Sequence, residues 1–532
     1  MTMLEAFRAA AVSSGDRPLL RYFDRVLTYA DVDQLSDALA VALQDRGFQQ
    51  GDRAAFYLQN VPQYVIALLA TWKAGGIAVA INPMLTAGEV AKLVADSTPS
   101  VLIALDELYT PQVADALASS SVTRIITTSP LDWQTDNDTR VLPGDRLAVP
   151  DGAEDLCALT EAYDGRSPAD VSPGNDDIAV ITYTSGTTGK PKGATNTHGN
   201  VVMGGSSYRD WFDLDGDDVV LGVAPLFHVT GLTGHIACTI AAQASLVLTY
   251  RVHTEVLVDA IRRHRASFTV GAITVFIALG ESAAIHPEDL ASLTKIASGG
   301  APIAAATADR FKQRFGTYIH NVYGMTETTG PVLGVPLGHH APVEAETQAL
   351  SVGKPMGDTR VTVLDDDGNP LPPGQIGELA VAGPQIVPGY WRNDDATRAA
   401  IRDGRLLTGD VGYADGDGWY YLVDRKKDMI VASGYKVWPR EVEDVLYTHD
   451  AVLEAGVVGV PDPYRGETVK AFVSLRSGHT ATAEELVDYC RTRLAAYKYP
   501  RLIEIVDAIP KTATGKILRR QLREGVPGQP PG

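Results

Sequence analysis

The chain contains little cysteine and no excess of basic residues, and both shortages exclude classes of protein. Its 532 residues include 3 cysteines, Cys157, Cys238 and Cys490, which lie too far apart for a disulfide framework or a zinc site. Acidic residues outnumber basic ones by 65 to 46, so the formal net charge is −19. Because nucleic-acid-binding proteins carry a basic surface, we expect no nucleic-acid partner.

Long apolar runs are also missing. The apolar stretch at residues 65–80 is interrupted by Lys73 and by Gly75-Gly76, too early for a bilayer span. The first eight residues lack the basic and apolar regions of a signal peptide. We therefore expect a cytoplasmic protein with no integral membrane span. Peripheral attachment to a membrane and formation of a homodimer stay open.

The sequence does contain a loop that is rich in glycine, hydroxyl groups and lysine. Residues 183–193 read Tyr-Thr-Ser-Gly-Thr-Thr-Gly-Lys-Pro-Lys-Gly and follow a β-branched, apolar run at residues 177–182 that predicts a buried strand. Such a loop can line a polyphosphate with backbone N–H, hydroxyl and ammonium groups. It is not the usual P-loop, because its glycine spacing is too short and Pro191 disfavours a helix directly after it. The pattern predicts a nucleotide triphosphate site of another kind.

Periodic patterns along the chain predict the fold class. Residues 28–43 have helical spacing, residues 53–58 read as a strand, and residues 86–95 read as a helix that a Thr86…Glu89 capping box opens. Alternation of this kind indicates parallel sheets with helices on their faces. The polar, turn-rich residues 132–175 read as a connector.

The pattern changes in the last third of the chain. From residue 361 short strands alternate with turn clusters, which predicts a small β subdomain. We predict an α/β protein with an N-terminal domain at residues 1–424, built from two α/β subdomains and the small β subdomain. A small α+β C-terminal domain follows at residues 425–532, with a disordered tail at residues 525–532.

Further motifs occur in order along the chain and together resemble one family. They are Ala-Pro-Leu-Phe-His-Val-Thr-Gly at 224–231, Asn-Val-Tyr-Gly-Met-Thr-Glu at 321–327, Thr-Gly-Asp at 408–410, Asp-Arg-Lys-Lys-Asp-Met-Ile at 424–430, Ser-Gly-Tyr-Lys-Val-Trp-Pro at 433–439 and Pro-Lys-Thr-Ala-Thr-Gly-Lys at 510–516. With the glycine-rich loop, this set resembles the adenylate-forming superfamily of acyl-CoA synthetases, luciferases and peptide-synthetase adenylation domains. Residues 389–391, 424–439 and 497–500 look most like bacterial fatty-acyl-CoA ligases.

The resemblance implies a reaction in two steps. The carboxylate of a small-molecule acid attacks the α-phosphate of ATP, which gives an acyl-adenylate and pyrophosphate; the thiol of CoA then displaces AMP. Such chemistry depends on positioning and on neutralising charge. ATP and CoA are therefore the implied co-substrates, and Mg²⁺ is the implied cofactor.

The resemblance also implies the residues of the nucleotide site. The β- and γ-phosphates would contact Thr184, Ser185, Gly186, Thr187, Thr188, Gly189 and Lys192. The nucleoside and its immediate surroundings would involve Gly299, Gly300, Ala301, Pro302, Asn321, Tyr323, Gly324, Asp410 and Arg425, with Tyr323 against adenine and Asp410 on the ribose. Thr326 would bond the α-phosphate, Glu327 would ligate Mg²⁺, and Lys516 would bridge the acid and the α-phosphate.

For the second step the resemblance implies a mobile C-terminal domain. Family members rotate this domain so that the CoA thiol can reach the adenylate, and the hinge here would be Lys427. Ser433, Gly434 and Tyr435 would then line the channel for the pantetheine arm of CoA.

The implied acyl pocket contains small and apolar residues and no carboxylate that could hold an amino group. Its predicted members are His228, Val229, Gly231, Ala272, Thr274 and Phe276, with His228 shielding the site rather than acting in acid–base catalysis. An apolar acid is therefore favoured over an amino acid. Medium- or long-chain fatty acids come first, and aryl or steroid-derived acids stay open.

Three alternatives to this function remain. One is a ligase that passes its acyl-adenylate to the thiol of a carrier protein. The second is a kinase-like NTPase, which would release ADP instead of AMP. The third is a non-catalytic relative that binds acyl nucleotides, which the presence of both Glu327 and Lys516 disfavours.

Overall fold

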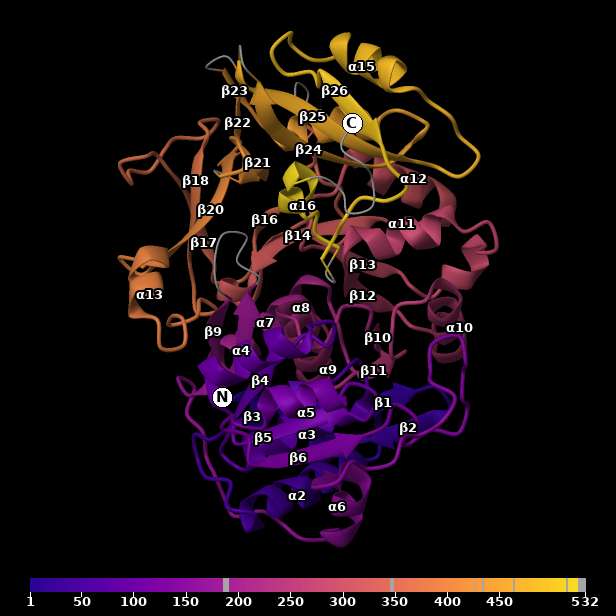
Figure 1. Ribbon diagram of the computed structural model, residues 1–532, viewed down its shortest axis with the longest axis vertical. Coiled ribbons are helices and arrows are strands. Elements are labelled where there is room, and N and C mark those ends of the chain that lie inside the picture. Colours follow the sequence, from indigo (N-terminus) through magenta and orange to yellow (C-terminus); the bar gives the residue numbers. More distant parts are fainter. Residues whose placement is uncertain are drawn as a thin grey trace.

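The computed structural model describes residues 1–184, 191–344, 349–425, 427–432, 435–462, 465–512 and 515–524. Within these residues the strands form four sheets, two large ones in the lower and middle parts of Figure 1 and two smaller ones above them. The layers confirm the predicted α/β class, with a large N-terminal part and a small C-terminal part. In the described part of the chain, no helix combines the length and the apolar composition needed to cross a bilayer.

The first large sheet carries the predicted phosphate loop at one edge. Its order is β7 (Ala153–Asp155), β6 (Arg124–Thr128), β5 (Val101–Leu105), β3 (Arg53–Tyr57), β4 (Ile77–Ala80), β8 (Ile178–Thr184) and β9 (Lys192–Thr197). All pairs are parallel except β8 with β9, so the chain reverses between them. The glycine-rich loop therefore joins two antiparallel strands, and no helix follows it directly.

Helices cover both faces of this sheet because successive side chains of a strand point to opposite faces. In β3, Ala54 and Phe56 belong to one buried cluster, whereas Ala55 and Tyr57 belong to another. The surrounding helices are α2 (Tyr29–Asp45), α3 (Pro62–Lys73), α4 (Ala87–Ser97), α5 (Pro111–Leu117) and α6 (Leu156–Ala162). At the start of α4 the predicted capping box is present, since Thr86 N donates to Glu89 Oε2 at 2.9 Å.

The second large sheet is mostly parallel and has antiparallel edges. Its order is β16 (Lys354–Pro355), β15 (Gly330–Gly334), β14 (Ile319–Met325), β13 (Lys295–Ser298), β12 (Phe268–Gly271), β10 (Val219–Leu221), β11 (Ser245–Leu248), β1 (Pro18–Tyr22) and β2 (Arg25–Thr28). Its helical segments are α1 (Met3–Ser13), α7 (His198–Trp211), α8 (Val229–Gly231), η1 (Leu232–Ala237), α9 (Cys238–Ala242), α10 (Thr254–His264), α11 (Ile273–Glu281), η2 (Pro287–Leu290), α12 (Ala305–Phe315) and η3 (Thr326–Thr328).

The predicted β subdomain forms the third sheet. It contains β17 (Arg360–Leu364), β18 (Gly377–Ala382), β20 (Arg405–Ala414), β19 (Ile401–Arg402) and β21 (Tyr420–Arg425), with α13 (Asp394–Ala400) beside it. One expectation about the N-terminal part needs correction, because β7 and α6 lie inside the segment that was expected to be a connector. The polar sequence of β7, Ala-Glu-Asp, gives no strand pattern, so only its pairing with β6 reveals it.

The C-terminal part forms the fourth sheet and has its own buried core. The sheet contains β23 (Tyr435–Val437), β22 (Ile430–Ala432), β25 (Gly466–Leu475), β24 (Val452–Asp462) and β26 (Leu502–Ile505), and its helices are α14 (Pro439–Tyr447), α15 (Ala483–Arg491) and α16 (Arg519–Glu524). The buried clusters of this part begin at Ile430. The third sheet ends at Arg425, and a domain boundary at residue 424 stays a prediction. The predicted tail at residues 525–532 lies outside the described residues.

Candidate functional site

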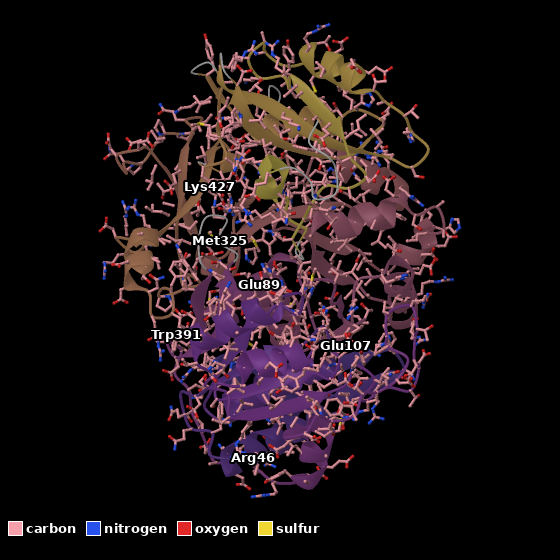
Figure 2. All side chains as sticks on the ribbon, in the orientation of Figure 1. Arg46, Glu89, Glu107, Met325, Trp391 and Lys427 are labelled. Atoms are coloured by element: carbon pink, nitrogen blue, oxygen red, sulfur yellow. The ribbon has the colours of Figure 1, made fainter. Side chains whose placement is uncertain are left out.

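A cavity of about 1320 Å³ lies where the large sheets, the β subdomain and the C-terminal part meet. Figure 2 shows Glu89, Met325 and Lys427, three of its lining residues, one above another in the middle of the molecule. They come from distant parts of the sequence, so the cavity is a product of the tertiary fold. Its predicted lining residues are Thr184, Lys192, His228, Val229, Gly299, Gly300, Gly324, Thr326, Glu327, Arg425, Lys427 and Lys516.

Beside this cavity, Asp410 connects a tyrosine and an arginine from two different sheets. Tyr323 at the end of β14 donates its hydroxyl to Asp410 Oδ2 at 2.7 Å, and Arg425 Nε lies 3.1 Å from Asp410 Oδ1. Burial and then the charge of Asp410 raise the pKa of Tyr323 well above its usual value, so the phenol stays protonated. The carboxylate is therefore held in one orientation at the edge of the cavity, with its charge partly balanced by Arg425.

Glu327 is a second buried carboxylate, and it faces the cavity from η3. Its Oε1 accepts a hydrogen bond from the hydroxyl of Tyr390 at 2.6 Å, and the Lys192 ammonium group lies 5.0 Å from the centre of the Tyr390 ring. Asn196 donates to the carbonyl of Thr326 at 3.2 Å and so joins β9 to the same turn. Glu327 thus keeps its position through side chains from two other elements.

Lys516 reaches the cavity from a tight loop ahead of α16. Thr512 N donates to Lys516 O at 2.8 Å, and Lys516 N donates to Thr512 Oγ1 at 3.1 Å. Gly515 has a φ of +77° and lies against the N-terminal part, where a Cβ would be 2.8 Å from Thr274 Oγ1 and 2.9 Å from the Cβ of Ala272. This loop therefore docks through a position that only glycine fits without displacement.

Burial, and next the positive charge of Arg425, lower the pKa of the Lys516 ammonium group to about 8. Both effects disfavour the charged form. A negatively charged ligand in the cavity would favour that form, since an opposite charge nearby stabilises it. The electrostatics of the cavity therefore suit an anionic ligand beside Lys516.

His228 precedes α8 and faces the same lysine. Burial and the charge of Lys516 lower its pKa to about 4, so the imidazole is neutral at physiological pH. Thr230 N donates to His228 Nδ1 at 3.2 Å, which leaves the proton on Nε2. A neutral ring fixed in this way is a poor general acid at neutral pH, and the shielding role expected for His228 stays a prediction.

Several residues predicted for the site do not line the large cavity. Asn321 uses its side chain to bond the carbonyl of Ser351 at 3.1 Å. Phe276 packs against Phe311, with ring centres 5.8 Å apart, and lines a separate, smaller pocket. Tyr435 is 57% exposed and stacks on Tyr497. The others are Gly231, Ala272, Thr274, Ala301 and Pro302, of which Ala272 and Thr274 face the Gly515 loop, and Tyr323 and Asp410, which lie beside the cavity.

Other predicted residues cannot be placed. Ser185, Gly186, Thr187, Thr188 and Gly189 of the glycine-rich loop lie outside the described residues, as do Ser433 and Gly434 of the predicted CoA channel. Thr184 and Lys192, which precede and follow these residues, line the cavity.

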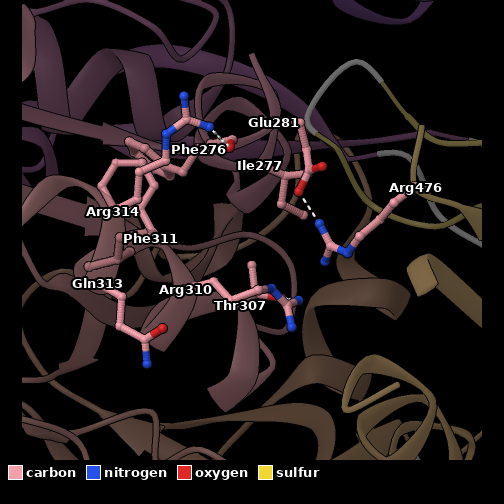
Figure 3. Close-up of a pocket in the computed structure, with 11 residues that line it drawn as sticks. Phe276, Ile277, Glu281, Thr307, Arg310, Phe311, Gln313, Arg314 and Arg476 are labelled. Atoms are coloured by element: carbon pink, nitrogen blue, oxygen red, sulfur yellow. Dashed lines mark hydrogen bonds and ion pairs between the residues drawn. The ribbon is translucent and has the colours of Figure 1, made fainter. Parts of the chain in front are cut away.

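The smaller pocket, of about 380 Å³, lies at the contact between the N-terminal and C-terminal parts. Figure 3 shows Arg476 of the C-terminal part directed at Glu281 at the end of α11, with which it forms an ion pair. Arg310 of α12 also donates to the carbonyl of Tyr447 in α14 at 3.5 Å. These polar contacts help to hold the two parts in the orientation that brings Lys516 to the cavity.

Sequence reasoning did not assign several aromatic side chains to the cavity, among them Tyr390 and Tyr208. Tyr390 lies in the Gly-Tyr-Trp stretch at residues 389–391, which supported the resemblance without indicating a contact with Glu327. Tyr208 lies in the middle of α7, and nothing in the helix sequence distinguishes it from a core residue.

The protein has two large sheets covered by helices and a small C-terminal part, and these meet at a cavity lined or bordered by buried carboxylates and a lysine. This combination of fold and site is that of an adenylate-forming ligase. Residues 7–391 match the AMP-binding enzyme family, and residues 441–516 match the AMP-binding enzyme C-terminal domain. The chain therefore belongs to the AMP-binding enzyme family, as an AMP-forming acyl-CoA synthetase that uses ATP and CoA as co-substrates.

Individual relatives act on different acids, to judge from their names. The chain is 36% identical to a long-chain-fatty-acid–CoA ligase of Bacillus subtilis (strain 168), over 98% of this chain and 94% of that protein. It is 35% identical to a feruloyl-CoA synthase of Amycolatopsis sp, over 95% of each chain. The structure of a benzoate CoA ligase from Burkholderia xenovorans LB400 superposes with a TM-score of 0.86 at 27% identity, over 98% of this chain and 100% of that one.

Proposed function

We propose that this synthetase activates an apolar carboxylic acid in the large cavity, first as an acyl-adenylate and then as a CoA thioester. The observation that carries this proposal is the convergence of Lys516 and Glu327 on one cavity, with the Tyr323–Asp410–Arg425 group at its edge. Lys516 and Glu327 suit the reacting phosphate and carboxylate groups, and the Tyr323–Asp410–Arg425 group suits a nucleoside. Together they support adenylation of an acid.

The nucleoside end of the cavity is assigned to Asp410 and Tyr323. A buried, fixed carboxylate can accept hydrogen bonds from two adjacent ribose hydroxyls, and the ion pair with Arg425 helps to hold it in place. The Tyr323 ring would lie against adenine. Gly299 and Gly300 offer backbone with no side chain on the opposite wall. The β- and γ-phosphates would lie along the glycine-rich loop, between Thr184 and Lys192.

Mg²⁺ fits this site only if ATP supplies most of its ligands. Within the described residues, no group of three or more His, Cys, Asp or Glu side chains could hold a metal ion by itself. Mg²⁺ commonly binds to one carboxylate, to phosphate oxygens and to water, and Glu327 offers Oε2, since Tyr390 occupies Oε1. When bound, the ion would neutralise charge on the phosphates, while Tyr390 would keep Glu327 oriented toward them.

Lys516 is assigned to the reacting groups themselves. Its ammonium group would contact both the acid carboxylate and the α-phosphate, and would stabilise the negative charge that the transition state concentrates between them. Thr326 would donate its hydroxyl to the α-phosphate. Docking of the Gly515 loop against Ala272 and Thr274 supports this assignment, because it fixes the base of the lysine side chain.

The acid is proposed to be apolar, with medium- or long-chain fatty acids ahead of aryl or steroid-derived acids. Val229, Val322 and Pro331 give this part of the cavity an apolar lining. The relatives support both classes, since one is named for long-chain fatty acids and another for ferulate. His228, neutral and fixed by Thr230, would separate the reacting carboxylate from water.

The second step is proposed to use CoA after the C-terminal part has rotated about Lys427. Burial and the charge of Arg425 lower the pKa of Lys427, which lies between the third and fourth sheets. Tyr435 is exposed in the present orientation and would reach the pantetheine arm only after such a movement. Transfer to a carrier-protein thiol is the second candidate; cytoplasmic location and oligomeric state also stay predictions.

A substrate screen tests this function. The purified chain is incubated with ATP, Mg²⁺ and a panel of fatty, aryl and polycyclic acids, and pyrophosphate and AMP are measured with and without CoA. We expect acid-dependent release of pyrophosphate, and faster AMP release when CoA is added. Release of ADP, or no pyrophosphate with any acid, would overturn the proposal. No response to free CoA would favour a carrier protein as acceptor.

A further inference from the structure

Tyr208 of α7 is a buried side chain at the wall of the large cavity. It lines the cavity, yet only 3% of the residue is exposed. Its ring is held in place by Phe212, with ring centres 6.4 Å apart, and by Phe268 at 6.2 Å. The backbone of Gly234 closes in from η1, where a Cβ would come within 3.1 Å of the Tyr208 ring. The side chain therefore has little room to move.

The hydroxyl of Tyr208 forms no hydrogen bond with any residue that the structure describes. Among other buried tyrosines of the N-terminal part, Tyr22 donates to the carbonyl of Pro130 at 2.9 Å and Tyr29 donates to that of Ala244 at 2.9 Å. Tyr64, like Tyr208, has no hydroxyl bond to a described residue, but it does not line the cavity. The hydroxyl of Tyr208 is not one of the fully enclosed side-chain atoms that lack a partner, so it is open to the cavity. Because this hydroxyl is at the cavity wall, a bound ligand can supply the missing bond.

Tyr208 and His228 border the cavity at different points along one helical segment. His228 faces Lys516 and immediately precedes the segment formed by α8 and η1. Gly234, which touches the Tyr208 ring, lies six residues further on, inside η1. Tyr208 thus packs beside a later turn of this segment than the one next to His228. Val229, Val322 and Pro331 also line the cavity.

We propose that Tyr208 is a specificity-determining residue, whose hydroxyl binds a hydroxyl group at the end of the acid remote from its carboxylate. This inference rests on the proposed function and narrows its substrate class to acids with an apolar body and a distal hydroxyl group. Hydroxylated aryl acids and ω-hydroxy fatty acids both belong to this class. Burial raises the pKa of Tyr208, so the phenol is neutral and can both donate and accept a hydrogen bond.

Matched acids test the inference. The value of kcat/KM for pyrophosphate release is measured with p-hydroxycinnamate against cinnamate, and with ω-hydroxydecanoate against decanoate, for the wild type and for Tyr208→Phe. We expect the wild type to prefer the hydroxylated member of at least one pair by about tenfold or more, because a site that bonds a hydroxyl discriminates against its absence. Tyr208→Phe should abolish this preference by lowering kcat/KM for the hydroxylated acid alone.

Tyr64→Phe is the control. Tyr64 is also buried, 2% exposed, and packs on Phe56 away from the cavity, so its change should affect both acids of a pair equally. A wild type without preference in either pair, or an equal effect of Tyr208→Phe on both acids, would overturn the inference. Competition between the paired acids for the wild type tests the preference without any variant. If no acid at all releases pyrophosphate, the proposed function fails instead.

Discussion

The N-terminal and C-terminal parts of this synthetase contribute to the cavity in opposite ways. The N-terminal part supplies the strand ends, the aromatic side chains and the carboxylates that line or border it, among them Glu327 and Asp410. From the last hundred residues come only Thr512, Lys516 and Leu518, within the described lining. Most residues that can contact the substrates thus come from the N-terminal part, whereas the described residues among the last hundred contribute one cationic side chain, Lys516.

The contacts that join these two parts are also different from those inside each part. Both parts have buried apolar cores of their own. Between them, the ion pair of Arg476 with Glu281 and the bond from Arg310 to the Tyr447 carbonyl are polar and partly exposed. Polar contacts of this kind stabilise an interface much less than a buried core does. Adenylation should therefore be sensitive to how the small part docks, and binding of the nucleotide much less so.

The strongest test of this comparison is Lys516→Ala. Loss of the ammonium group should lower the rate of adenylation about a thousandfold, the effect expected when a charge-stabilising group is removed from a reacting centre. Thioester formation from a supplied acyl-adenylate should remain. The two half-reactions are measured separately by pyrophosphate release and by consumption of the adenylate.

The matched control is Lys511→Ala, since Lys511 lies in the same loop but pairs with Glu454 at 2.6 Å. It should leave both half-reactions within a few fold of the wild type. If Lys516→Ala slowed adenylation and thioester formation equally, the assignment of Lys516 to adenylation alone would be contradicted.

A second test alters docking without removing the lysine. Gly515→Ala should slow adenylation roughly ten- to a hundredfold, because its Cβ would collide with the fixed Cβ of Ala272 and would displace the lysine from the reacting groups. Gly478→Ala is the control: Gly478 has the same φ of +77° but no atom within 4 Å of an added Cβ. Both variants carry the same backbone strain, so a similar rate for both would show that docking at Gly515 is unimportant. Single-turnover pyrophosphate release gives the rates.

A third test uses pH. The pKa of Lys516 is lowered to about 8, so its ammonium group is present below that pH and is lost above it. We expect kcat/KM for adenylation, which reports the free enzyme, to fall about tenfold between a plateau near pH 7 and pH 9. The residual activity of Lys516→Ala should lack this step. A profile that is flat to pH 10 in the wild type would argue against a charged Lys516 in the reaction.

The smallest expected effect concerns the ion pair at the edge of the smaller pocket. Glu281→Gln removes its charge, and because the pair is partly exposed we expect only a two- to fourfold loss of adenylation rate, most visible at low salt. Nucleotide affinity should not change. Glu288→Gln, at an exposed position nearby in η2, is the control. An equal response of the two variants would exclude a role for the ion pair.

Local structure was largely predictable where neighbouring residues determine it. Thr86 and Glu89 form their capping box because both partners lie within one helical turn. The strand before the glycine-rich loop was expected at residues 177–182 and is found at Ile178–Thr184. By contrast, β7 was missed, since three residues without an apolar pattern become a strand only through pairing with β6.

The candidate site was predictable where a motif contains its own contacts, and less so elsewhere. Thr326 and Glu327 were expected together and lie together in η3. Tyr390 was not expected beside Glu327, since 63 residues separate them. Phe276 was expected in the acyl pocket because it is apolar and follows β12, but the orientation of α11 directs it to α12 and the smaller pocket.

The sequence by itself determined the family and the order of the motifs, because each motif is a run of adjacent residues whose spacing is fixed by the covalent chain. Tertiary structure alone decided which side chains share the cavity: that Tyr208 lines it, that Tyr390 holds Glu327, and that Gly515 places Lys516 against the N-terminal part. Contacts between distant segments depend on how helices and sheets pack, and packing is a collective result of the whole core that no single segment encodes.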